Sequence, residues 1–352
     1  MKSRLLRLLP LLLLLAGCER RQSAVQSGDR MQVLHRGIGY EVTGLDPQLA
    51  TGISEGAIET ALFEGLVAED PKDLHPVPGV AESWDVAGDG LAYTFHLRAD
   101  ARWSNGKPVT AGDFAASWQR ILSPALAAPN AALLYVLQGA EAYHHGAIRD
   151  FSRVGVAALD ARTLRVILDH AAPDFLERLT HWAWLPVYLP AIEAQGGAED
   201  RGNAWARPGR LVGNGAFLLQ SWTPDREIVL ARSPNYWDAR RVALREIHLY
   251  PIDSVEAEER AFRAGQLHVT DAIPIGRIEA YRRDAPQLLR VDPYLGTYYY
   301  ALNVRHPSFG DPRVRRALSL AIDREAIAAK ILHGVDQPAT AFTPAGIEGY
   351  AP

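Results

Sequence analysis

The sequence is poor in sulfur and in long apolar runs. Its 352 residues include one cysteine, Cys18, so neither an intrachain disulfide nor a metal site built from several thiolates is available. The apolar stretch at 8–15 contains Pro10 and is shorter than the roughly 20 residues that a membrane-spanning helix needs. No repeat of fixed period occurs, which argues against solenoids and propellers. Packing alone must therefore stabilise the fold.

The chain also lacks a large excess of charge of either sign. The chain has 37 basic and 41 acidic residues, a net charge of -4 and only 22% charged residues. This mild acidity gives no general attraction to phosphate backbones, and nucleic acid is excluded as an expected partner. With 48% hydrophobic residues the chain can bury a core, and its length predicts two or three structural units.

The first residues have the pattern of a targeting signal. Basic side chains at Lys2, Arg4 and Arg7 precede the apolar stretch, and 15–18 reads LAGC. This order is typical of a bacterial lipoprotein signal, with residues 1–17 removed and Cys18 carrying the lipid. Cleavage would remove three of the basic residues and no acidic one, leaving a net charge of -7. Polar residues follow, and we expect 18–30 to be a short flexible tether.

Further along, strand and helix signals alternate irregularly. Apolar and polar residues alternate at 93–98 after a Gly-Asp-Gly turn, which predicts a hairpin strand. Thr110 and Asp113 form a capping-box pattern at the start of a helix. Asp311, followed by Pro312, and then Asp323 predict two more helix starts. The fold class is therefore mixed α/β.

Short blocks spread over 40–344 resemble the periplasmic oligopeptide-binding proteins of ABC transporters, the extracellular solute-binding protein family 5. They are 44–47 (GLDP), 62–66 (LFEGL), 78–84 (PGVAESW), 93–98 (YTFHLR), 103–106 (WSNG), 108–111 (PVTA) with 113–114 (DF), 233–238 (SPNYWD), 290–300 (RVDPYLGTYYY) and 313–315 (RVR).

The resemblance implies an α/β clamp of three lobes, a periplasmic binding protein fold with an extra lobe. By the family's architecture, lobe I would comprise 31–63 and 188–295, lobe II 64–187, and lobe III would start at 296. Family chains continue beyond the point that matches Pro352, so lobe III, 296–352, is expected to be incomplete, in a chain truncated at its C-terminus.

The resemblance also implies a binding protein and not an enzyme, without a cofactor or a metal. It would be a monomer that captures short peptides in the periplasm. Its partners would be the permease and ATPase subunits of an ABC importer, and Cys18 would anchor it to a membrane of the bacterial cell envelope. Two alternatives remain open: a receptor or binder for another family ligand (murein peptide, heme or a nickel chelate), or an inactive truncated remnant.

A binder of varied peptides should pair with the ligand backbone and leave roomy pockets for side chains. Thr51, Gly52 and Ile53 match the family loop whose main chain does this, and Gly52 permits close backbone approach. Asn130 stands where the oligopeptide binder has a tyrosine that helps to hold the peptide amino terminus. The acidic partner of that amino group in the family would lie beyond residue 352.

Four further residues match positions beside the ligand cleft in relatives: His181, Asp271, Tyr294 and Tyr299. The two tyrosines flank the point where the chain should pass between lobes. A plain packing role is open for two of them. Residues 298–300 also fit a strand with alternating faces, which could account for Tyr299, and a lone histidine such as His181 is more often a packed or surface residue than a ligand contact.

Two patterns that could indicate catalysis or metal binding have simpler explanations. Residues 52–56 fit G-x-S-x-G with Ser54 as the nucleophile of a hydrolase, but a polar segment with Pro47 precedes them instead of the apolar strand that such an elbow requires. The adjacent His144 and His145 would point apart, so a solvated loop is favoured over a metal site. A second polar run, at 256–260, is interpreted as a solvated helix face.

Overall fold

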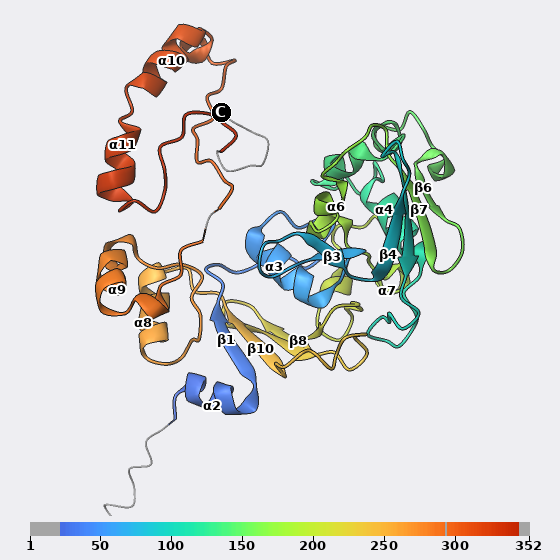
Figure 1. Ribbon diagram of the computed structural model, residues 1–352, viewed down its shortest axis with the longest axis horizontal. Coiled ribbons are helices and arrows are strands. Elements are labelled where there is room, and N and C mark those ends of the chain that lie inside the picture. Colours follow the sequence, from blue (N-terminus) through green and yellow to red (C-terminus); the bar gives the residue numbers. More distant parts are fainter. Residues whose placement is uncertain (1–21, 293, 345–352) are drawn as a thin grey trace, which may run out of the picture. The chain divides into compact units, whose positions relative to one another are not determined.

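The computed structural model describes residues 22–292 and 294–344, which form two compact units, one ending at Asp271 and one beginning at Ala272 (Figure 1). The second unit thus begins before residue 296, the expected start of lobe III, and the lobe bounds stay predictions. The predicted signal and Cys18 lie outside the described residues. Over the part of the chain that is described, no helix is both long and apolar enough to cross a membrane.

The strands of the first unit form three sheets. One has the order β1-β10-β9-β8, the second pairs β2 with β3, and the third has the order β4-β5-β7-β6. Their bounds are β1 Val33–Gly37, β2 Val67–Glu69, β3 Pro76–Pro78, β4 Ala81–Val86, β5 Ala92–Leu97, β6 Val156–Ala158, β7 Thr163–Ile167, β8 Phe217–Thr223, β9 Glu227–Arg232 and β10 Glu246–Tyr250.

The α-helices of the first unit connect and cover these sheets. They are α2 Ala24–Met31, α3 Ile53–Leu62, α4 Ala111–Ile121, α5 Ala140–His144, α6 Phe175–Arg178, α7 Leu189–Glu193 and α8 Val255–Arg263. Short 3₁₀ turns add η1 Ala131–Val136, η2 Phe151–Arg153, η3 Trp182–Trp184 and η4 Ala204–Ala206.

The β1-β10-β9-β8 sheet joins distant parts of the chain. Its edge strand β1 runs parallel to β10, with Val33 opposite Glu246, whereas β10, β9 and β8 are antiparallel. A parallel neighbour needs a long connection, and here that connection contains the other two sheets.

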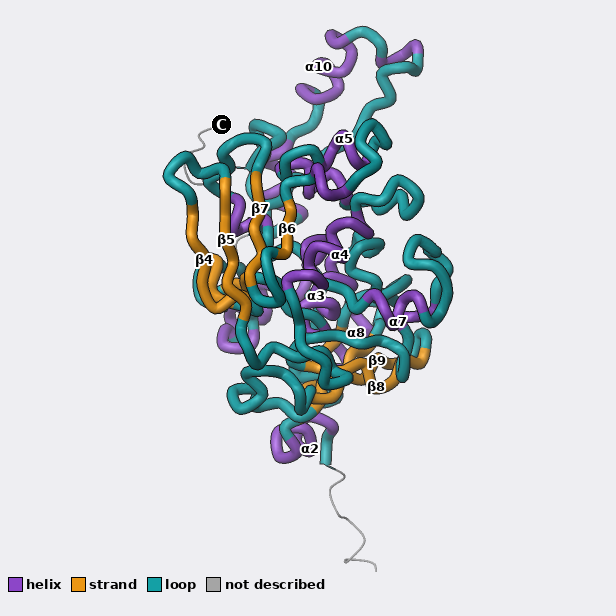
Figure 2. The backbone as a smooth tube through the Cα atoms, turned by 90° about the vertical axis from the view of Figure 1, so that its right-hand side faces the viewer, coloured by secondary structure: helices purple, strands orange, loops and turns teal. Residues whose placement is uncertain are grey.

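The β4-β5-β7-β6 sheet is antiparallel throughout and is built from a single stretch of chain, and α4 packs against its β6–β7 side (Figure 2). The predicted hairpin strand is confirmed as β5, which pairs with β4. The predicted capping box is also confirmed: the backbone N–H of Asp113 donates to Thr110 Oγ1 (3.2 Å), and the backbone N–H of Thr110 donates to Asp113 Oδ2 (2.7 Å).

The largest fully buried side chains of the first unit are aromatic. Four tryptophans are at most 1% exposed: Trp103, Trp118, Trp184 and Trp205. Trp118 and Trp184 meet edge to face, and Trp118 Nε1 donates to the carbonyl of Trp184 at 3.0 Å. The indole N–H of Trp118 is thus satisfied inside the core, so the ring can be buried without an orphaned donor.

The expectation of a flexible tether at 18–30 is wrong for the residues from 24 onward. Residues 24–31 form helix α2, capped by Ser23 in a capping box with Gln26. The backbone N–H of Val25 donates to the carbonyl of Gly265 at 3.0 Å, and α2 packs on β1. The polar composition suggested a tether, but a reciprocal cap and this docking order the segment.

The polar run at 256–260 is not a solvated face throughout. Glu258 and Glu259 on α8 are 1% and 7% exposed. Glu258 accepts the backbone N–H of Asp271 at 3.1 Å and fills the space above Gly37, which has no Cβ to exclude it.

The second unit contains η5 Ile275–Arg277, α9 Ile278–Asp284, η6 Pro286–Leu288, η7 Pro307–Phe309, α10 Pro312–Leu320, α11 Arg324–Ala326 and a π-helical turn at Ile327–Ile331. The predicted starts of α10 and α11 are confirmed: Asp311 accepts the backbone N–H of Arg313 at 2.8 Å, and Asp323 accepts that of Ala326 at 2.9 Å. Residues 298–300, which also fitted a strand, are irregular.

Candidate functional site

A tight turn at residues 46–50 leads into helix α3. The carbonyl of Asp46 accepts the backbone N–H groups of Leu49 (2.9 Å) and Ala50 (3.0 Å). The carbonyl of Ala50 in turn accepts two side-chain donors, Asn130 Nδ2 at 2.9 Å and Trp182 Nε1 at 3.2 Å. The chain is therefore held on both sides immediately before residue 51.

The next three residues present unused backbone donors. Thr51 and Ile53 are exposed, and Gly52 has an extended conformation as the N-cap of α3 without a side-chain cap. Among the acceptors of the described chain, none receives the backbone N–H of Thr51, Gly52 or Ile53. Extended backbone with free N–H groups on a fixed support can pair with another extended chain.

Two glycines allow this local packing. A Cβ at position 52 would lie 2.8 Å from Tyr40 Oη and would collide with the Glu55 carboxylate, and a Cβ at position 56 would collide with the Trp182 indole. Gly56 therefore lets the Trp182 ring lie directly on α3, where it reaches the Ala50 carbonyl. The close approach of the Trp182 ring excludes a side chain at position 56, whereas at position 52 the Glu55 carboxylate and the Tyr40 hydroxyl would have to shift.

The buried carboxylate of Glu55 ties the segment before the turn to α3. Its Oε1 accepts the backbone N–H of Thr43 at 3.1 Å, and its Oε2 lies 3.4 Å from Tyr40 Oη. The Tyr40 hydroxyl is also 3.4 Å from the backbone N–H of Ser54. These contacts fix the first turn of α3.

One turn further along α3, Glu59 is fully buried. In the described part of the chain neither carboxylate oxygen has a hydrogen-bond partner. Burial first, and then the nearby carboxylates of Asp46 and Glu55, raise the pKa of Glu59 well above its ordinary value. The raised pKa favours the protonated, neutral form of Glu59, and a neutral carboxyl costs less to bury than a charged one.

The structure brings most of the predicted site residues of the first unit to this turn. His181 stacks on Trp182 with ring centroids 3.9 Å apart, and its Nδ1 accepts the backbone N–H of Ala183. Burial lowers the pKa of His181, so the ring is neutral at neutral pH. Asp271 is exposed, and its Oδ2 lies 3.0 Å from the place of a Cβ on Gly39, the residue before Tyr40.

Tyr294 and Tyr299 belong to the second unit. They are 77% and 57% exposed. The Tyr299 ring meets Phe342 edge to face at 4.9 Å, and Gly296 lies against the ring of Tyr294. Their predicted role as ligand contacts stays a prediction.

Ser54 does not have the environment of a hydrolase nucleophile. It is buried in the first turn of α3, and its hydroxyl donates to the carbonyl of Ile38 at 3.1 Å. The residues before it form the 46–50 turn and no strand. The nucleophile elbow is therefore absent around Ser54.

One group within the described residues has ligand atoms close enough to hold a cation: Asp70, Asp73 and His75, whose ligand atoms lie within 4.8 Å of one another. It lies on the β2–β3 turn, and Asp73 and His75 are exposed. Asp70 and Asp73 accept backbone N–H groups of the same turn, and Asp73 also bonds the His75 ring. Hydrogen bonds within the turn therefore explain why these three side chains lie close together, without a bound cation.

Sequence reasoning missed the residues that support the turn. Asp46 was visible only as part of a family block, and no pattern in the sequence pointed to a role for Gln48, Arg120, Trp182 or Trp205. A strongly polar residue inside an apolar helix pattern was the available signal at Arg120. The partners of Trp182 and Trp205 are far away in sequence, so no local pattern could have revealed them.

Comparison with known proteins identifies the relatives. The model of bacterial extracellular solute-binding proteins, family 5 Middle, matches residues 75–352. The periplasmic oligopeptide-binding protein OppA of Escherichia coli K12 is 40% identical over 321 residues, which are 90% of this chain and 58% of that protein. The periplasmic murein peptide-binding protein MppA of the same organism is 36% identical over 323 residues, 91% of this chain and 58% of that protein.

Solved structures agree. The structure of E. coli MppA, a murein tripeptide-binding protein, superposes with a TM-score of 0.85 at 36% identity, covering 91% of this chain and 61% of that one. Haemophilus influenzae OppA, solved in complex with the peptide RPPGFSPFR, gives a TM-score of 0.82 at 32% identity, covering 90% and 61%. The chain thus spans about 60% of the length of these relatives. It is a member of the bacterial extracellular solute-binding proteins of family 5.

Proposed function

We propose that this protein captures short peptides in the periplasm and delivers them to the permease of an ABC importer, without acting as an enzyme. The observation that carries the proposal is the row of free backbone N–H groups at Thr51, Gly52 and Ile53. The relatives named for oligopeptide and murein peptide binding support the same ligand class.

The proposed mechanism is the addition of the peptide as a strand. Backbone N–H groups recognise the feature that all peptides share, their carbonyl oxygens, so ligands of different sequence can be accepted. The first turn of α3 is already fixed by Glu55 and Tyr40, so little ordering is needed when the peptide arrives. Asn130, which bonds the Ala50 carbonyl, and His181, which stacks on Trp182, are candidate side-chain contacts beside this turn, and Asp271 stays a predicted contact.

We assign the two four-stranded sheets of the first unit to different lobes. The β1-β10-β9-β8 sheet belongs to lobe I (31–63 and 188–295) and the β4-β5-β7-β6 sheet to lobe II (64–187). Tyr294, at the end of lobe I by these bounds, and Tyr299, in lobe III (296–352), stay predicted ligand contacts. Closure of the lobes would bury the peptide.

Calorimetric titration of the full-length protein tests this function. We expect Ala-Ala-Ala and RPPGFSPFR to bind, and glucose and free alanine to give no heat. N-methylation of the backbone of Ala-Ala-Ala should weaken binding more than exchange of its side chains. Absence of binding by every peptide, murein tripeptide included, would contradict the proposal.

A glycine pair sharpens the test. Gly52→Ala places a methyl group against Tyr40 and Glu55, and we expect at least about a 10-fold weaker peptide affinity, about 1.4 kcal/mol. Gly88→Ala is the matched control, because Gly88 is exposed in the β4–β5 turn with nothing within 4 Å of the new methyl group. Equal affinities of the two variants would exclude the 51–53 backbone from the site.

We also propose that the protein is a lipoprotein anchored through Cys18. The LAGC sequence at 15–18 supports this, and lipidation would keep the protein at a membrane of the cell envelope. Membrane fractionation is the test: Cys18→Ser should release the protein or leave it unprocessed. A soluble form of the unmodified protein, cleaved elsewhere, would contradict the anchor.

A further inference from the structure

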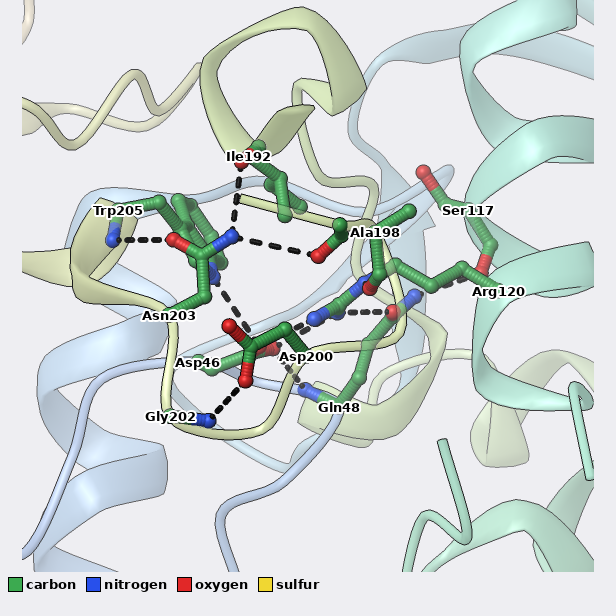
Figure 3. Close-up of polar contacts among 11 residues, drawn as sticks. Asp46, Gln48, Ser117, Arg120, Ile192, Ala198, Asp200, Gly202, Asn203 and Trp205 are labelled. Carbon is green, nitrogen blue, oxygen red and sulfur yellow. Dashed lines mark hydrogen bonds and ion pairs between the residues drawn. The ribbon is translucent and has the colours of Figure 1, made fainter. Parts of the chain in front are cut away.

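A buried ion pair lies beneath the proposed peptide-binding backbone. The Arg120 side chain on α4 is 2% exposed and that of Asp46 is 11% exposed. Arg120 donates to both carboxylate oxygens of Asp46, from Nη2 to Oδ2 at 2.7 Å and from Nη1 to Oδ1 at 3.2 Å (Figure 3). This is the two-point geometry in which a guanidinium fixes the orientation of a carboxylate, and not only its distance.

The pair connects three separate segments of the chain. Besides Asp46, Arg120 donates through Nε to the carbonyl of Ala198 (2.6 Å) and through Nη1 to Gln48 Oε1 (2.6 Å). Trp205 Nε1 donates to Asp46 Oδ2 at 3.1 Å. The turn, helix α4 and the 198–205 segment therefore meet at one carboxylate (Figure 3).

Asp46 passes this constraint to the backbone of the turn. Its carboxylate Oδ1 accepts the backbone N–H of Gln48 at 3.1 Å, while its carbonyl accepts those of Leu49 and Ala50. Gln48 Nε2 donates to the carbonyl of Ser117, one turn before Arg120 on α4 (2.7 Å). Every residue from 46 to 50 except Pro47 is thus hydrogen-bonded within the turn or to α4, Asn130 or Trp182.

Stability alone is a weak reason for such a pair, since desolvation offsets most of the attraction between buried charges. What the pair supplies is one fixed geometry. We propose that Arg120 is a positioning residue: its two-point bond to Asp46 sets the 46–50 turn so that the free N–H groups of residues 51–53 are pre-aligned for a peptide backbone. This rests on the proposed function and adds to it a residue that never touches the ligand.

Hydrogen exchange on the ligand-free protein measures the positioning directly. In Arg120→Gln we expect the backbone amides of residues 48–50 to exchange at least about 10-fold faster, with peptide affinity reduced about 10-fold or more. Arg120→Lys keeps the positive charge but lacks the guanidinium that bonds both carboxylate oxygens. Its amide exchange rates and peptide affinity should therefore lie between those of the unmodified protein and Arg120→Gln. Asp46→Asn nearly preserves shape, and it provides the same readouts if Arg120→Gln does not fold.

The matched control is Leu249→Ala, a cavity in β10 of the other sheet, where Leu249 is 5% exposed. It should lower global stability without faster exchange at 48–50 and without loss of affinity. Unchanged exchange in both Arg120→Gln and Asp46→Asn would overturn the positioning role, as would faster exchange with undiminished peptide affinity. An equal affinity loss in Leu249→Ala would overturn it too. If the unmodified protein bound no peptide, the proposed function would fail, while the exchange data would still decide whether Arg120 orders the turn.

Discussion

Helices α4 and α10 start with similar local signals and differ in what lies around them. Thr110 caps α4 and Asp311 caps α10. On α4, Phe114, Trp118 and Ile121 are all 0% exposed, whereas on α10 Val314 is 40% and Leu318 is 44% exposed. A cap thus tells where a helix begins, but tertiary packing determines what its apolar face contributes to stability.

The same contrast holds for the two units. Described residues of the second unit contribute only Ile278 and Ala328 to the buried apolar set, while the first unit has one continuous hydrophobic core. The buried charged side chains also lie in the hydrophobic unit, since Asp46, Glu59 and Arg120 all belong to the first unit.

Replacement of a core aromatic should separate the two helices most strongly. Trp118→Ala removes a fully buried ring and the bond to the Trp184 carbonyl, and we expect it to cost about 3–5 kcal/mol of the free energy of unfolding. Leu318→Ala on α10 should cost under about 1 kcal/mol, because its side chain is already in water. Urea titration of both variants checks this, and similar costs would break the comparison.

A partly buried acid, Glu64, should make the first unit sensitive to pH. Tyr236 Oη (2.5 Å) and Trp237 Nε1 (2.6 Å) donate to the carboxylate of Glu64. Burial nevertheless raises the pKa of Glu64 from 4.5 to about 7. Between these values the folded state keeps a proton that the unfolded state releases, so stability falls as pH rises from 4.5 to 7. The loss amounts to roughly 3 kcal/mol at most.

Glu64→Gln should abolish that part of the pH dependence, which melting curves from pH 4 to 8 would measure. Tyr236→Phe provides the control, because removal of a donor to the carboxylate should move the midpoint to higher pH. If the difference between Glu64→Gln and the unmodified protein were flat across this range, Glu64 would not be the titrating group.

The caps themselves should contribute less than the core. Thr110→Ala removes the hydroxyl that accepts the Asp113 N–H, and we expect a cost of about 1 kcal/mol in the unfolding of the first unit. Asp311→Ala should reduce helical circular dichroism from 312–320 without changing the melting of the first unit. A loss of first-unit stability from Asp311→Ala would show that the two units unfold together.

Surface ion pairs should have the smallest effect. Arg178 and Asp174 are paired at 2.9 Å on α6, with 44% and 57% of their side chains exposed. Arg178→Gln should change stability by no more than about 0.5 kcal/mol, and 1 M NaCl should remove even that difference. A larger loss of stability that persists in salt would mean that solvent exposure does not explain why this ion pair should contribute less than the buried Arg120–Asp46 pair.

Local features of the fold could be predicted from the sequence, and long-range ones could not. The β5 strand and the starts of α4, α10 and α11 follow from alternation and capping, which act over a few residues. The helix at 24–31 was missed because its docking partner, Gly265, is far along the chain. At the site, the family resemblance pointed to 51–53, but the support from Arg120 and Trp182 depends on contacts that only the folded chain makes.

The parallel pairing of β1 with β10 has a consequence for synthesis. The β4-β5-β7-β6 sheet closes within residues 81–167, so its strands can pair while the rest of the chain is still being made. Strand β1 emerges first but must wait for residue 246 before its register can form. Until then its open edge needs protection from wrong partners, so the earliest strand of the protein is also among the last to find its place.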